Sequence, residues 1–179
     1  RVRLAKRIGS IVVATTNHVR DGVIAELCQD LMLPVFKGNE CDVLGRYYFA
    51  AQYFGATSIV RVTSDCPFVD PGILDSVIEL LQRPGSDYAS NTLVRTYPDG
   101  LDVEAFTFAA LAKAHREAKG RELREHVTLY FTGRRPHLAS GQYNCMGLML
   151  MQNLSQVQWS VDVPEDLEPV VVYCDEYGN

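Results

Sequence analysis

The chain has 179 residues and a mass of 20.0 kDa, and its 47% of apolar and 22% of charged residues exclude a disordered protein and a fibre. Its net charge of −5, without a basic run, does not suit a nucleic-acid-binding protein. No apolar stretch approaches the roughly 18 residues of a membrane helix, and no secretory signal opens the sequence. We therefore expect one cytoplasmic domain over residues 1–179.

The first half of the chain has the pattern of alternating strands and helices. Continuous apolar runs are typical of buried parallel strands, and each helix has an apolar stripe at helical spacing. The expected elements are a strand at 11–15, a helix of about 11 residues, a strand at 35–36, a helix from Asp42 to Gly55, a strand at 58–63 and a helix that begins at Asp70-Pro71. This order predicts a parallel sheet with right-handed crossovers.

The second half is less regular, and residues 136–158 have no clear pattern. Alternation of apolar and polar residues predicts a strand, and apolar residues at helical spacing predict helices. The expected elements are a strand at 101–106, a helix capped by Thr107, a helix over 122–131, a short strand at 159–161, and a helix that begins at Pro164 and contains Leu167, Val170, Val171 and Cys174. No repeat or linker divides the chain, so we expect one domain.

Three segments carry carboxylates where predicted strands end, and ligands of parallel sheets bind at such ends. These segments are 63–67, 99–104 and 160–166. Carboxylate oxygens are the ligands that magnesium prefers, and magnesium commonly arrives with nucleotide phosphates. Asp65 and Asp162 are therefore candidate magnesium ligands. Each also has a simpler interpretation, since Asp65 can make a turn before Pro67 and Asp162 can cap the last helix.

Several other polar residues have two interpretations each. Cys66 lies within the first carboxylate segment, but no base is placed for it, so a small core residue is the more common outcome. The other cysteines are scattered without a Cys-x-x-Cys pair, which argues against disulfides and a zinc site. His126 is either a ligand-binding group or a solvated helix residue. Arg46 either has a function or extends over the core, and Arg95 is a candidate partner of phosphate or carboxylate.

The motifs together resemble the SpsF-type spore-coat polysaccharide biosynthesis cytidylyltransferases, which are related to the CMP-sialic acid and CMP-Kdo synthetases. The resemblance is collinear and covers nearly the whole chain. The YPDGLDVE and REHVT motifs are the most specific, whereas the Asp-x-Pro motif is shared across the wider superfamily. The matching segments are 12–16, 42–47, 61–67, 97–104, 124–128 and 161–167.

This resemblance implies a nucleotide-diphospho-sugar transferase fold with three α/β/α layers and a mostly parallel sheet. It also implies a reaction that joins CTP to an acidic or amino sugar and releases pyrophosphate. The roles it implies are Asp65 and Asp162 as catalytic magnesium ligands, Ala14 and Thr15 beside the base, and Asp102, Glu104, Arg124 and His126 facing the sugar. The expected partners are CTP and a sugar. A homodimer is a further possibility.

The sequence departs from the family pattern at its start. The family opens with a strand and a glycine- and arginine-containing loop that holds the triphosphate, and no such loop is found here. Residues 1–7 look like the end of the helix that follows this loop. We therefore expect a domain without its first strand and loop, in which the strand at 11–15 has one unpaired side.

Two other functions fit the same residues. A glycosyltransferase of similar fold would use Asp102 and Glu104 as a metal site and would transfer from a finished nucleotide sugar. A non-catalytic nucleotide-binding or accessory domain would keep the fold without turnover. Release of pyrophosphate from CTP distinguishes the cytidylyltransferase from both.

Overall fold

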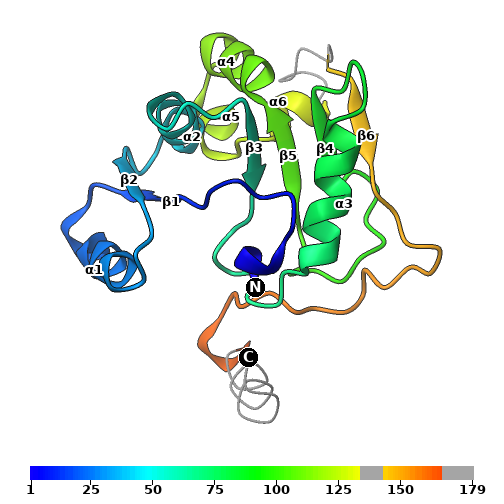
Figure 1. The fold of residues 1–179 in the computed structure, drawn as a ribbon, viewed down its shortest axis with the longest axis horizontal. Helices are drawn as coiled ribbons and strands as arrows, with labels where there is room; N and C mark the ends of the chain where they lie inside the picture. Colours follow the sequence, from blue (N-terminus) through cyan, green and yellow to red (C-terminus); the bar gives the residue numbers. More distant parts are fainter. Residues whose placement is uncertain (134–142, 167–179) are drawn as a thin grey trace.

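The computed structural model describes residues 1–133 and 143–166, and its first half alternates strands and helices as predicted (Figure 1). The elements are β1 (Val13–Thr16), α1 (Gly22–Asp30), β2 (Val35–Gly38), α2 (Val43–Tyr53), β3 (Ser58–Arg61) and α3 (Pro71–Leu81). Short 3-10 helices, η1 (Val2–Leu4) and η2 (Val19–Asp21), precede β1 and α1. The two caps predicted in this half are confirmed: Asp42 accepts from the N–H of Gly45 at 2.8 Å, and Asp70 accepts from the N–H of Ile73 at 3.0 Å.

The second half differs from the predictions in several places. Its elements are β4 (Tyr88–Ser90), β5 (Glu104–Thr107), α4 (Phe108–Glu117), α5 (Arg121–Glu125), α6 (Leu129–Thr132), β6 (Cys145–Gly147) and the 3-10 helix η3 (Pro164–Asp166). The helix predicted over 122–131 is two short helices, because the backbone leaves the helical region at His126 (φ −98°, ψ 83°). The strand predicted at 159–161 is wrong, since this region forms only one isolated bridge, between Gln158 and Asp99.

The end of the chain is only partly described. A 3-10 helix begins at Pro164, where the sequence predicts the start of the last helix. The remaining residues assigned to that helix, Leu167, Val170, Val171 and Cys174, lie outside the described residues.

The strands form two sheets in the described part of the chain. The first is the parallel pair β1–β2, and the second has the order β3-β5-β4-β6. In the second sheet β5 is antiparallel to both β3 and β4, whereas β4 and β6 are parallel. Strands β3, β4 and β6 therefore share one direction. Together with the parallel pair β1–β2, this gives the α/β fold with parallel strands that the sequence predicts, whereas β5 runs the other way and makes two antiparallel pairings.

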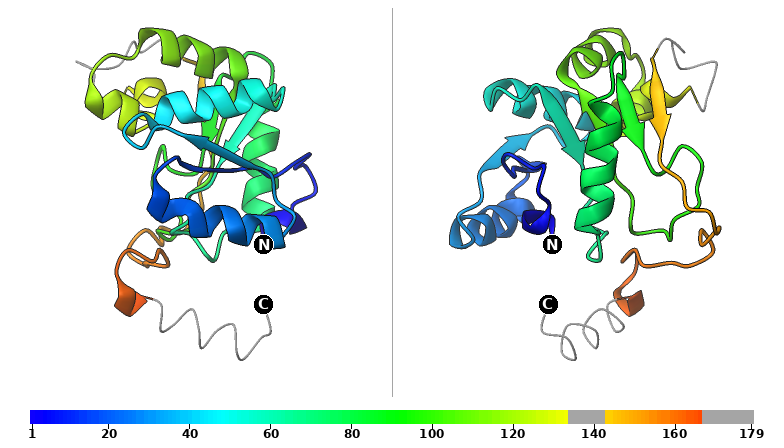
Figure 2. Two further views of the ribbon diagram at one scale, coloured as in Figure 1. Left: turned by 90° about the vertical axis from the view of Figure 1, so that its left-hand side faces the viewer. Right: turned by 45° about the vertical axis from the view of Figure 1, so that its right-hand side comes forward.

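Helices cover both faces of the larger sheet and complete the three layers (Figures 1 and 2). Alternate residues of β5 point to opposite faces, so Phe106 joins one core and Ala105 the other. The core under α2 and α4 is built on Tyr88, Phe106, Leu111 and Phe131, and the core under α3 is built on Leu74, Val77, Val103 and Ala105. Among the described residues, no helix has the length and apolar character needed to cross a membrane.

Strand β1 is paired along one edge only. It pairs in parallel with β2, from Val13 opposite Val35 to Thr16 opposite Gly38. Within residues 1–133 and 143–166 no ladder joins its other edge to another strand, as expected from the sequence. Strand β3 likewise pairs only with β5 there. The unpaired edges of β1 and β3 lie on either side of the space in which we place the functional site.

Candidate functional site

A cavity of about 980 Å³ lies between the two sheets. Residues of β1 and β3 line two of its sides, and residues of α2 and α3 line the others. Ala14 and Thr15, which the family resemblance places beside the base, both border this cavity. The unpaired edges of β1 and β3 both belong to its lining.

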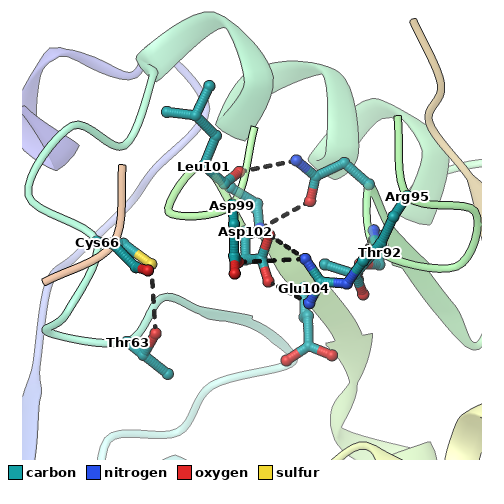
Figure 3. Close-up of polar contacts among 12 residues, drawn as sticks. Thr63, Cys66, Thr92, Arg95, Asp99, Leu101, Asp102 and Glu104 are labelled. Atoms are coloured by element: carbon teal, nitrogen blue, oxygen red, sulfur yellow. Dashed lines mark hydrogen bonds and ion pairs between the residues drawn. The ribbon is translucent and has the colours of Figure 1, made fainter. Parts of the chain in front are cut away.

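The loop after β3 borders the same cavity and carries the first carboxylate segment. A turn closes between Thr63 and Cys66, where the N–H of Cys66 donates to the carbonyl of Thr63 at 3.2 Å. The Cys66 thiol also lies 3.4 Å from the Thr63 hydroxyl (Figure 3) and 3.6 Å from the Asp65 carboxylate. Thr63, Ser64, Cys66 and Pro67 contact the cavity. Asp65 belongs to this loop but is not itself among the residues that line the cavity.

The environment of Cys66 does not favour a nucleophile. The residue is 7% exposed, and burial raises the pKa of its thiol to about 11. The hydrogen bond with Thr63 lowers this pKa, whereas the negative charges of Asp65 and Asp102 raise it further. At pH 8 only about one Cys66 thiol in a thousand is therefore a thiolate.

We accordingly expect Cys66 to resist alkylation. With iodoacetamide at pH 8, the exposed Cys41 should be modified quickly, and Cys66 should stay free in the folded protein. Peptide mass spectrometry over a time course measures both sites in one sample. Modification of Cys66 as fast as Cys41 would contradict the buried, protonated thiol.

The third carboxylate segment lies against the first two. The N–H of Val161 donates to the carbonyl of Asp65 at 2.8 Å. Asp99 donates its N–H to Val157 at 2.9 Å and accepts from the N–H of Trp159 at 2.7 Å. Residues 157–161 are thus joined to the loop after β3 and to the segment that leads to β5. The structure brings together the three segments that the sequence singles out.

Gly100 allows this close approach. Its φ of +97° lies in the left-handed region, and a Cβ atom there would lie 2.4 Å from the backbone of Trp159 and Ser160. Only glycine avoids both the strain and the overlap. Gly120 has a similar φ of +85°, but a Cβ atom there would meet nothing within 4 Å.

Gly100→Ala is therefore expected to displace residues 157–161. Trp159 is the single tryptophan of the chain, so its fluorescence reports this displacement directly. We expect a red-shifted emission and stronger quenching by acrylamide, because Trp159 would lose its edge-to-face contact with Phe68 at 6.1 Å. Gly120→Ala carries comparable backbone strain without the overlap and should keep the wild-type emission. The same emission from both variants and the wild type would show that Gly100 does not hold this segment.

Two hydrogen-bond donors orient the carboxylate of Asp162, the other candidate magnesium ligand. Asp162 lies beside the residue that bonds to Asp65, and its Oδ2 accepts from Ser160 at 2.8 Å and from Gln158 at 3.0 Å. These two donors fix the direction of the carboxylate, and among the described residues none bonds to its other oxygen. Two hard oxygen donors from adjoining segments fit magnesium. The described residues contain no ready-made group of three or more metal-ligating side chains, so substrate oxygens would complete the coordination.

Arg95 pairs with carboxylates of the second segment. Its Nη2 donates to Asp102 at 2.8 Å, and its Nη1 donates to Asp102 at 3.2 Å and to Asp99 at 3.3 Å (Figure 3). Burial raises the pKa of Asp102 above its ordinary value, although Arg95 acts in the opposite direction. Arg95 therefore orients Asp102, which lies near Cys66 at the same end of the sheet.

Glu104 is held inside the fold. It lies at the start of β5, is 7% exposed, and accepts from the Tyr88 hydroxyl at 2.7 Å. Its second oxygen forms an ion pair with Arg61 on the neighbouring strand β3. Both carboxylate oxygens thus have protein partners, and Glu104 links three adjacent strands below the site.

Arg124 and His126 lie in a different place from the carboxylate segments. They belong to α5 and its C-terminal end, beside α2, whereas residues 157–161 lie at the opposite end of β3 (Figures 1 and 2). Arg124 pairs with Asp42 and donates to the carbonyl of His115 at 2.8 Å. Partial burial raises the pKa of Asp42, but the hydrogen bonds from Arg124 and Gly45 outweigh it and hold this pKa below its ordinary value. The structure therefore does not bring Arg124 and His126 together with Asp102.

Sequence reasoning did not identify the partners that orient these groups. Ser160 and Gln158 hold Asp162, and Asp42 holds Arg124. Ser160 lies only two positions before Asp162, so the sequence contains a local signal for this hydrogen bond. The pairing of Asp42 with Arg124 joins residues 82 positions apart and has no local signal.

Comparison with protein families and curated proteins gives three findings. The cytidylyltransferase family model matches residues 1–171. An uncharacterised protein of Methanocaldococcus jannaschii is 41% identical over 130 residues, or 73% of this chain and 52% of that protein. The spore coat polysaccharide biosynthesis protein SpsF of Bacillus subtilis is 30% identical over 171 residues, or 95% of this chain and 69% of that protein. The chain thus spans about half the length of the archaeal relative.

Solved structures share the fold. A cytidylyltransferase of Leptospira borgpetersenii superposes with a TM-score of 0.89 at 26% identity, covering 99% of this chain and 73% of that one. A CMP:2-keto-3-deoxy-manno-octonic acid synthetase, solved with CTP, gives a TM-score of 0.68 at 11% identity, covering 98% of this chain and 84% of that one. At this low identity the second likeness concerns the fold alone. The predicted three-layer nucleotide-sugar transferase fold is confirmed.

Proposed function

The chain belongs to the cytidylyltransferase family, and from this premise we propose that it forms a CMP-sugar from CTP and an acidic or amino sugar. The observation that carries the proposal is the meeting of three carboxylate-bearing segments, the first of which borders the cavity between the sheets. SpsF, a relative described by its part in polysaccharide biosynthesis, supports a product used for a surface polysaccharide or another glycan. The synthetase of similar fold was solved with CTP, which supports CTP as the nucleotide.

The reaction consists of one displacement at phosphorus. A sugar hydroxyl attacks the α-phosphorus of CTP, the bond to the β-phosphate oxygen breaks, and pyrophosphate leaves as the hydroxyl loses its proton. Little covalent chemistry is left for side chains, so positioning and electrostatics dominate. In this proposal Ala14 and Thr15 border the base at the end of β1. Asp65 and Asp162 would hold magnesium, which supplies neutralisation of the triphosphate charge.

The sugar is proposed to lie beside the second carboxylate segment. Asp102, oriented by Arg95, would accept hydrogen bonds from sugar hydroxyls. Both carboxylate oxygens of Glu104 are already bonded, to Tyr88 and Arg61. Glu104 would therefore support the sugar site from the sheet beneath it. The sugar-facing role that the resemblance implies for Arg124 and His126 is a separate proposal, because both lie on α5 and away from Asp102.

A thermal shift screen of nucleoside triphosphates tests the nucleotide. With magnesium present, CTP should raise the melting temperature more than ATP, GTP or UTP. A ligand at a hundred times its dissociation constant adds about 2.7 kcal/mol to the free energy of unfolding, which is easily measured. An equal shift with all four nucleotides, or no shift with CTP, would contradict CTP as the substrate.

A further inference from the structure

Asn91 directly follows the last residue of β4 and is a polar residue that is only 2% exposed. Its Nδ2 donates to the carbonyl of Leu101 at 2.7 Å, and its Oδ1 accepts from the N–H of Val103 at 2.8 Å. The two bonds therefore lie on either side of one residue, Asp102. A buried amide whose nitrogen and oxygen both have partners fixes the backbone to which it bonds.

The side chain of Asn91 takes the place of a backbone bond between β4 and β5. The last pair of this ladder is Ser90 opposite Glu104, so the next pair is Asn91 opposite Val103. The two residues of a hydrogen-bonded antiparallel pair normally exchange two backbone bonds. Here the N–H of Asn91 donates to the carbonyl of Val103 at 3.4 Å, whereas the N–H of Val103 donates to the Asn91 side chain. Asn91 thus ends the ladder.

The end of the ladder leaves Arg95 and Asp102 opposite each other. The chain beyond Asn91 turns locally, because the N–H of Thr92 donates to the hydroxyl of Ser90 at 2.9 Å. Arg95 then donates to both carboxylate oxygens of Asp102, at 3.2 and 2.8 Å (Figure 3). Asp102 is therefore held twice: Arg95 directs its carboxylate, and Asn91 fixes the backbone on both of its sides.

This arrangement leaves the Asp102 side chain partly open between two buried neighbours. Leu101 and Val103 are 6% and 0% exposed, whereas the side chain of Asp102 is 26% exposed. None of the residues that hold this segment, Asn91 and Arg95 included, is among those that line the cavity between the sheets. The position of Asp102 therefore depends on bonded contacts at this end of the larger sheet, and not on that cavity.

We propose that Asn91 is a positioning residue for the sugar and acts through Asp102. This inference rests on the proposed function, in which Asp102 accepts hydrogen bonds from sugar hydroxyls. Such bonds need a narrow range of distance and angle, so a small displacement of the Asp102 backbone weakens them. Arg95 does not prevent this displacement, because its long side chain is 44% exposed and can follow the carboxylate. Fixing the backbone is the part that Asn91 supplies.

Steady-state kinetics of wild type, Asn91→Ala, Asp102→Ala and the double variant test this role. The sugars are N-acetylneuraminate, 2-keto-3-deoxy-manno-octonate and glucosamine, each with CTP and magnesium. Asn91→Ala should raise the KM for the sugar by about 10- to 100-fold, the scale of a misplacement of about 1 Å, and should leave the KM for CTP near that of wild type. The double variant should lose no more than Asp102→Ala alone, because both changes remove the same contact.

Asn144→Ala is the matched control. Asn144 also donates its side-chain amide to a backbone carbonyl, that of Gly85 at 2.9 Å, but it lies beside the other end of β4. This variant should keep the wild-type KM for the sugar. Asn91→Asp is the conservative variant, since a neutral carboxyl group has the same shape with one donor and one acceptor, and burial favours the neutral form. It should bind the sugar better than Asn91→Ala, and melting temperatures show that each variant is folded.

Hydrogen exchange followed by NMR gives a readout that does not depend on turnover. The amide of Val103 should exchange faster in Asn91→Ala than in wild type, whereas the amide of Phe106 within β5 should not change. Unchanged exchange at Val103, an unchanged KM for the sugar in Asn91→Ala, or losses that add up in the double variant would each overturn the positioning role. Wild type that forms no CMP-sugar with any of the three sugars would contradict the proposed function, and faster exchange at Val103 in Asn91→Ala would then still show that Asn91 holds the backbone of Asp102.

Discussion

Asp65→Asn is expected to lower the rate of pyrophosphate release from CTP by about 100-fold or more, the scale of losing one preorganised electrostatic group. The substitution removes a ligand charge where the triphosphate must be neutralised. The fold should be nearly unchanged, because Asp65 contributes its backbone carbonyl, not its carboxylate, to the bond with Val161. An asparagine can also keep the turn that this loop makes. Steady-state release of pyrophosphate and thermal melting measure the two effects separately.

Asp30→Asn provides the control for this variant. Asp30 ends α1 on an exposed surface, so its substitution changes the net charge equally without touching the site. It should keep wild-type turnover. Near-normal turnover of Asp65→Asn would instead mean that Asp65 only forms a turn, and it would remove this residue from the mechanism.

Arg61→Met is expected to reduce the free energy of unfolding by about 3 kcal/mol or more. The change leaves Glu104, which is 7% exposed, without its cation in the interior of the sheet. The hydrogen bond from Tyr88 remains but cannot replace the lost charge. Urea denaturation followed by circular dichroism measures the loss.

The double variant Arg61→Met/Glu104→Leu separates the cost of an unpaired charge from a general packing defect. Replacing both partners of a buried ion pair by apolar residues is often neutral, so this variant should regain most of the lost stability. A double variant as unstable as Arg61→Met alone would assign the loss to packing. A loss below about 1 kcal/mol in Arg61→Met would show that the pair is not effectively buried.

The first half of the fold follows from local signals in the sequence. Asp42 and Asp70 cap helices as their positions predict, and the apolar runs of β1 and β3 fall near the predicted positions. The second half depends on distant contacts. Strand β4 has only three residues, all buried, and so shows no periodicity. The direction of β5 follows from its pairing with β3 and β4, which no pattern within 104–107 contains.

The carboxylates of the candidate site were predictable from the sequence, but their hydrogen-bond partners were not. Asp65 and Asp162 follow expected strand ends, and the structure places their segments side by side. The partly apolar residues 159–161 predict a strand, but their hydrogen bonds go to Asp65 and Asp99, far away in the sequence.

The formation of pyrophosphate from CTP tests the central proposal most directly. The protein would be mixed with magnesium, CTP and each of a panel of acidic and amino sugars, and pyrophosphate and CMP-sugar would both be measured. We predict that the two products appear in equal amounts, only when a sugar substrate is present, and that other nucleoside triphosphates give much less. Release of CMP from a finished CMP-sugar, without any pyrophosphate from CTP, would contradict the proposal and identify a glycosyltransferase.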